Sequence, residues 1–148
     1  MTVEQAFEIL RSVPTEWGAS EAEVCAVESK LGVALPARLR ELMLCTGQKD
    51  HMSWLFPEGQ IAPLSELPTL RETAFEILQE DDPSRRPAFP FVALSQHQGY
   101  IFTFVRADGT PDPEMMSYQE GQGVLAGVVQ ESLSQFIAAA VASAVGRL

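Results

Sequence analysis

Residues 20–47 decide the fold, and they read SEAEVCAVESKLGVALPARLRELMLCTG. The stretch predicts two short helices joined by a tight corner. Ser20 and Glu23 have the spacing of a capping box at the start of a helix, and Gly32 suits the left-handed residue that ends one. Pro36 suits the first turn of the second helix. Apolar side chains recur at helical spacing on both sides of the corner: Val24, Val27, Leu31, Leu39, Leu42 and Met43.

The flanking sequence predicts further helices and a cluster of strands. Residues 2–13, 69–80 and 132–146 carry apolar stripes at helical spacing. Residues 91–94, 99–106, 115–118 and 124–129 are rich in apolar, aromatic and β-branched side chains, which favours strands. The short apolar runs at 54–56 and 61–67 border or contain proline, so we interpret them as edge strands or irregular segments.

This order of elements is typical of the α+β class, with a mainly antiparallel or mixed sheet flanked by helices. A chain of 148 residues has the size of one ordinary domain. We expect a single domain over 1–148, made of an N-terminal helix and loop (1–19), the helical corner (20–47), and a sheet region with a C-terminal helix (48–148).

The two cysteines, Cys25 and Cys45, fall in the predicted helices beside apolar positions. We expect small buried thiols in a reducing compartment and no disulfide framework. The first residues lack a basic start with an apolar run, and no apolar stretch reaches the length of a membrane span. The sequence therefore predicts a cytoplasmic protein without a membrane partner.

The net charge of −10 comes from 20 acidic and 10 basic residues. Nucleic acid is disfavoured as a partner because phosphate binding needs basic patches. An acidic surface can attract a basic protein partner, but acidity also serves solubility alone.

No catalytic or metal-binding pattern stands out. His51 and His97 lie in predicted loops without a paired catalytic acid in sequence, and no serine sits in a nucleophile elbow. The cysteines and histidines lack the short spacing of a zinc site, and no glycine-rich phosphate loop occurs. We expect no enzyme activity, no cofactor and no metal.

Two acidic regions remain as candidate contact surfaces. Residues 66–82 hold six carboxylates against Arg71, a net charge of −5, and residues 107–123 hold four carboxylates and no base. Each is either a solvated face or a docking surface for a basic partner. Because residues 80–82 place acids at a helix C-terminus, we expect that end to be frayed or to continue as a mobile loop. An exposed aromatic residue could add an anchor, although packing into the core is the commoner use. The candidate partner-binding residues are Trp54, Glu76, Glu80, Asp82, Asp108, Asp112 and Glu114.

The corner resembles the N-terminal signature of the SUKH superfamily of SMI1/KNR4-like proteins. The similarity rests on Glu28-x-x-Leu31-Gly32-x-x-Leu35-Pro36 and on the later order of strands, acidic-glycine turn and closing helix with Phe136. The chain departs from the family in residues 46–48, Thr-Gly-Gln, where members often carry Asn-Gly-Gly. The resemblance implies one α+β domain, no catalysis and a role in binding other proteins.

The superfamily includes bacterial immunity proteins and a fungal regulator of cell-wall assembly. The resemblance therefore implies, as the leading hypothesis, an immunity protein that neutralises a bacterial toxin. A basic nuclease is one candidate for that toxin. The alternatives are a regulatory or scaffold module and a small-molecule-binding domain. Oligomeric state stays open.

Overall fold

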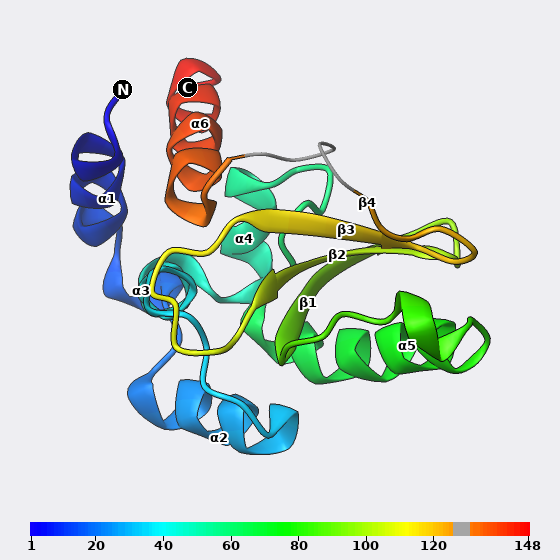
Figure 1. The fold of residues 1–148 in the computed structure, drawn as a ribbon. Helices are drawn as coiled ribbons and strands as arrows, with labels where there is room; N and C mark the ends of the chain where they lie inside the picture. The colour runs from blue at the N-terminus through cyan, green and yellow to red at the C-terminus, as the bar shows by residue number, and fades with distance from the viewer. Residues whose placement is uncertain (126–130) are drawn as a thin grey trace.

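A computed structural model describes residues 1–125 and 131–148 (Figure 1). Its helices are α1 (Val3–Ser12), α2 (Glu21–Leu31), α3 (Ala37–Thr46), α4 (Lys49–Leu55), α5 (Leu67–Gln79) and α6 (Leu133–Gly146), with 3₁₀ turns η1 (Thr15–Trp17), η2 (Leu64–Glu66) and η3 (Pro83–Arg85). Its strands are β1 (Phe91–His97), β2 (Ile101–Arg106), β3 (Met115–Gln119) and β4 (Gly123–Leu125).

The four strands form one antiparallel sheet in the order β1-β2-β3-β4. At one end of the sheet Phe91 pairs with Arg106, and at the other end His97 pairs with Ile101. β2 is thus an inner strand of the sheet. The α+β class and the mainly antiparallel sheet are confirmed.

Helices cover both faces of the sheet, and each face has its own core. Phe102, Phe104 and Tyr118 are fully buried against α5, which lies along one face (Figure 1). Val105 and Met115 face the larger core, which α1, α2, α3, α4 and α6 complete. The alternation along each strand therefore separates an aromatic layer from an aliphatic one.

The helical corner forms as predicted, and its two glycines end their helices in different conformations. Ser20 and Glu23 make both hydrogen bonds of the capping box, and Gly32 ends α2 at φ 72°. Gly47 ends α3 with an ordinary φ of −69°. A side chain there would meet the Met43 carbonyl oxygen at 2.4 Å, so close packing requires this glycine.

The segment around Trp54 differs from the prediction, because it is helical. Trp54 and Leu55 are the last residues of α4, Phe56 is its C-cap, and Pro57 follows. Met52 and Leu55, one turn apart, are buried in the larger core, and this tertiary burial outweighs the β propensity of a short aromatic run. Ala62 donates one backbone hydrogen bond to Leu94 of β1 (2.9 Å) without forming a strand.

Three smaller differences concern the ends of elements and the cysteines. α5 begins at Leu67, two residues before the predicted start. Of the strand predicted over 124–129, the first part lies in β4 and residues 126–129 lie outside the described residues. Cys25 is exposed and Cys45 is half-buried, so the prediction of two buried thiols is wrong for Cys25. None of the described helices is both long and apolar enough to cross a bilayer.

Candidate functional site

The exposed side of α5 carries the first acidic candidates. Glu76 and Glu80 are exposed and lie one helical turn apart. Asp82 follows the helix and accepts a hydrogen bond from the Ser84 backbone N–H (3.0 Å). This hydrogen bond lowers the pKa of the Asp82 carboxyl, so the group stays charged. The three carboxylates form an acidic end to α5.

Asp81 has a structural role that the sequence did not predict. Its carboxylate accepts hydrogen bonds from the Tyr118 hydroxyl (2.6 Å) and the Gly121 N–H (3.0 Å), and it pairs with Arg85 (2.8 Å). Only 4% of the side chain is exposed. The hydrogen bond from Tyr118 contributes most to holding the pKa of Asp81 far below its usual value. The expectation of a frayed or mobile end after α5 is therefore wrong, because Asp81 ties this segment to β3.

The connection between β2 and β3 carries the second group of candidates. Asp108 is exposed, and its carboxylate accepts hydrogen bonds from the Thr110 hydroxyl (2.7 Å) and N–H (3.2 Å). Arg106 lies 3.3 Å away. The Thr110 hydroxyl is the largest cause of the lowered pKa of Asp108. Asp108 therefore shapes the turn and places a negative charge on the surface of the turn.

Asp112 and Glu114 have different surroundings. Asp112 is half-buried and accepts hydrogen bonds from the Ser134 N–H (2.9 Å) and hydroxyl (2.5 Å), in the first turn of α6. It satisfies one of the backbone donors that a helix start leaves free. Glu114 is exposed, and its backbone forms an isolated bridge with Ser132. Of these two, Glu114 is the one whose carboxylate is open to a partner.

The two acidic groups lie at opposite ends of the sheet. Asp81 contacts Tyr118 and Gly121 near the end where His97 pairs with Ile101, whereas Asp108 follows Arg106 at the other end. Six residues of β2 separate the ends, which corresponds to about 17 Å at the usual rise of a strand. Figure 1 shows the C-terminal end of α5 and the β2–β3 connection far apart. The structure therefore makes two separate acidic surfaces out of the predicted contact residues.

Trp54 belongs to a half-buried aromatic cluster. Its ring meets Trp17 edge-on at 5.5 Å between centroids, and Trp17 stacks on His51 at 4.6 Å. The Trp54 carbonyl accepts a hydrogen bond from Arg147 (2.5 Å). These contacts hold the ring in place, so Trp54 presents only part of its surface to solvent.

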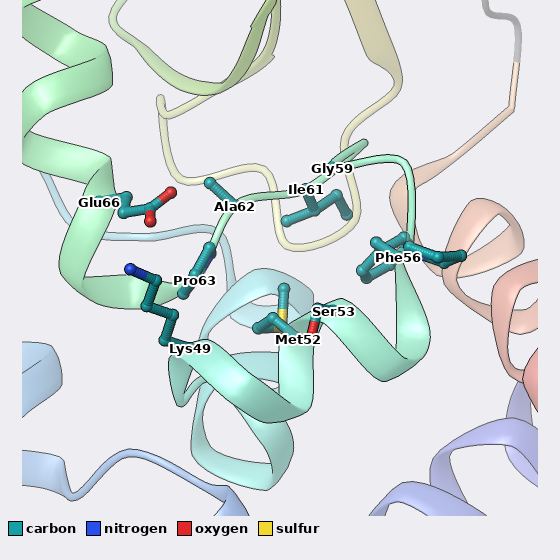
Figure 2. Close-up of a pocket in the computed structure, with 10 residues that line it drawn as sticks. Lys49, Met52, Ser53, Phe56, Gly59, Ile61, Ala62, Pro63 and Glu66 are labelled. Atoms are coloured by element: carbon teal, nitrogen blue, oxygen red, sulfur yellow. The ribbon is translucent and has the colours of Figure 1, made fainter.

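A small apolar pocket lies between α4 and the loop that follows it (Figure 2). Its volume is about 230 Å³. Met52, Phe56 and Ile61 line it, and Figure 2 shows Lys49 and Glu66 together on the side opposite Phe56. Ligand pockets usually reach roughly 300 Å³ or more, so this one is small.

The described residues contain no cluster of three side chains that could hold a metal ion. His97 is exposed at the end of β1, with its Nε2 3.1 Å from the Ser95 hydroxyl. Across residues 1–125 and 131–148 no carboxylate hydrogen-bonds to this imidazole, so it lacks the third group that orients a catalytic histidine.

The described residues form a four-stranded antiparallel sheet with helices on both faces and the α2–α3 corner at its side. This arrangement defines the SUKH-like class of α+β domains. The chain belongs to the SMI1 / KNR4 family (SUKH-1), whose sequence model matches residues 18–139. This membership is consistent with immunity or regulatory roles and with protein partners in general. Comparison of this chain with curated proteins and with solved structures found no significant match.

Proposed function

We propose that this chain is a non-catalytic protein-binding domain that acts as an immunity protein. It would bind a cognate toxin domain and occlude the toxin's active site or its substrate entry. Family membership supports a role through protein partners, and the net charge of −10 supports a basic partner such as a nuclease.

The acidic end of α5 is the observation that carries this proposal. Within the described residues, Glu76 and Glu80 have no basic group within ion-pair distance. By contrast, Glu41 pairs with two arginines and Glu21 pairs with Arg40. Glu76 and Glu80 are thus exposed carboxylates whose charge is not offset by neighbours, as a surface that attracts a basic protein requires.

Such a surface would act mainly on the rate of encounter. Complementary charges steer two proteins together and suppress wrong partners, while buried contacts supply most of the affinity. An acidic face would also resemble the charge of a phosphate substrate and compete for the same basic cleft. Trp54, with its partly exposed ring, is a candidate for the buried contact.

Co-expression with the product of the neighbouring gene tests the proposal. We expect the chain to rescue growth when that product is toxic and to co-purify with it as a stable complex. Absence of both rescue and complex would contradict the immunity function.

Charge reversal tests the contribution of α5. The double variant Glu76→Lys with Glu80→Lys should weaken binding at least about tenfold and reduce its salt dependence. The matched control is Glu4→Lys with Glu8→Lys, which reverses two exposed acids at the same spacing on α1. Equal affinities and equal salt dependence for the two double variants would contradict the electrostatic role of α5.

The double variant Asp108→Lys with Glu114→Lys tests the second acidic surface. Asp112 stays unchanged in this variant because it holds the start of α6. If only this variant loses the toxin, the contact lies at the β2–β3 connection and not on α5.

A regulatory or scaffold role is the second function that the family supports. It predicts a stable complex with a cell-wall or signalling protein and no rescue from toxicity. The pocket in Figure 2 does not by itself support the third expectation, a small-molecule-binding domain, because its volume is only about 230 Å³.

A further inference from the structure

A groove of about 370 Å³ separates the end of α2 from α5 and the segment that leads into β1. The helical corner supplies one wall, and α5 supplies another. The groove lies on the α5 side of the sheet. Its principal lining residues are Val33, Arg71, Phe75, Arg86, Phe89 and Phe91.

Aromatic rings form the apolar part of this groove, and they pack on buried rings of the sheet. Phe75 is 39% exposed, and its ring centroid lies 5.9 Å from that of Phe91. Phe91 in turn packs on the buried Phe102 (5.7 Å) and Phe104 (5.4 Å). Because buried rings fix the exposed ones, little conformational entropy is lost when a ligand binds them.

Two arginines supply the polar part of the groove. The Arg71 guanidinium lies 4.6 Å over the Phe75 ring and has no hydrogen-bond partner within the described residues. The Arg86 guanidinium uses two of its N–H groups on the Leu78 carbonyl (2.9 and 3.2 Å). A guanidinium carries five donors, so both arginines retain donors for an acceptor in the groove.

The charge of the groove is opposite to that of most of the molecule. No carboxylate lines it, whereas the chain as a whole has twice as many acidic as basic residues. The acids of α5 that come closest in sequence, Glu72 and Glu76, lie on the neighbouring side of the helix, one residue after Arg71 and Phe75. Asp81 is engaged with Arg85 and Tyr118.

We propose that this groove binds an extended segment of a protein partner that carries a carboxylate side chain next to apolar or aromatic side chains. The carboxylate pairs with Arg71 and Arg86, since guanidinium groups match carboxylate geometry. The apolar side chains lie on Phe75 and Phe91 and against Val33. The site does not depend on the partner being a toxin, because it uses a different surface and the opposite charge from the acidic end of α5.

Blocked pentapeptides of defined sequence test this site with the isotope-labelled full chain. The probe Gly-Glu-Leu-Phe-Gly should shift the backbone amide NMR signals of Val33, Phe75 and Phe91. It should bind at least about tenfold more tightly than Gly-Lys-Leu-Phe-Gly, which reverses the charge, and than Gly-Glu-Ser-Ser-Gly, which removes the apolar groups. Inorganic phosphate alone is the third control.

Arg71→Gln should lower the affinity for the acidic peptide about tenfold and abolish its preference over the lysine peptide. Lys30→Gln, which removes a charge from α2 outside the groove, should change neither. The proposal is overturned by equal binding of the acidic and lysine peptides, by phosphate binding with the same dependence on Arg71, or by unshifted groove signals at about 5 mM peptide. Unchanged amide spectra of both variants confirm that each is folded.

Discussion

The Tyr118 hydroxyl donates a 2.6 Å hydrogen bond to the Asp81 carboxylate, which joins β3 to the segment after α5. Tyr118 is fully buried, and its ring stacks on Phe102 at 5.2 Å. Burial and the adjacent carboxylate both raise the pKa of the Tyr118 hydroxyl. The hydroxyl therefore remains a donor, and the acidic end of α5 is held against the sheet.

Tyr118→Phe should lower the free energy of unfolding by about 1.5–3 kcal/mol, the usual range for a hydrogen bond to a charged group. The ring packing is kept, so the loss reports the hydrogen bond. Urea denaturation followed by circular dichroism measures it. Tyr100→Phe is the control, because Tyr100 is partly exposed and donates to Gln98 at the surface. A loss under about 0.5 kcal/mol in both variants would show that the hydrogen bond contributes little.

The pH dependence of stability should report the charge on Asp81. Its pKa is lowered in the folded state, mainly by Tyr118, from about 3.9 in the unfolded chain. Such a group stabilises the fold above the unfolded pKa, and this contribution is lost as pH falls toward the folded pKa. The difference in urea midpoint between the wild type and Asp81→Asn should thus be constant above about pH 5 and shrink below about pH 4. A constant difference down to about pH 2 would contradict this assignment.

Gly18→Ala should be strongly destabilising although Gly18 has an ordinary φ of −90°. A Cβ atom there would lie 1.8 Å from the Leu44 carbonyl oxygen, so the η1 turn would have to move away from α3. We expect a loss of about 3 kcal/mol or more and a matching fall in the urea midpoint. Gly146→Ala is the control, because a Cβ at the end of α6 meets nothing within 4 Å. It should be neutral or stabilising by up to about 1 kcal/mol.

Alanine substitutions at Asp112 and Glu114 should differ in their effect on the stability of the fold. Asp112→Ala removes the acceptor for Ser134 and should cost about 1 kcal/mol of unfolding free energy, as the loss of a helix cap does. Glu114→Ala should leave stability within about 0.5 kcal/mol of the wild type. Thermal denaturation of the two variants measures both effects. Equal stability of the two variants would show that Asp112 does not anchor α6.

The two thiols should react at different rates. Cys25 is exposed, with the Arg40 guanidinium 3.7 Å from its sulfur, whereas burial raises the pKa of the half-buried Cys45 thiol. A chromogenic disulfide reagent should therefore modify Cys25 about ten times faster than Cys45 at neutral pH. Cys25→Ser should remove the fast phase, and persistence of that phase would contradict the assignment.

Local patterns in the sequence predicted most of the helices. Capping boxes form at Thr2, Ser20 and Ser132, and each joins residues three apart in the chain. The prediction failed at α4, where burial of Met52 and Leu55 in a core contributed by distant segments made a short aromatic run helical. Nothing within a few residues of Trp54 encodes that core.

By itself, the sequence determined the α+β class, the helical corner and the family, because caps, a left-handed glycine and apolar periodicity act over three or four residues. Only the tertiary structure decided which acids are available to a partner. Asp81 is engaged by Tyr118, 37 residues away, and Asp112 by Ser134, 22 residues away, whereas Glu76 and Glu80 stay exposed. The arginine-lined groove likewise exists only where the corner, α5 and the start of β1 meet. Charge and propensity are properties of short segments, but burial and pairing depend on segments that the chain brings together only on folding.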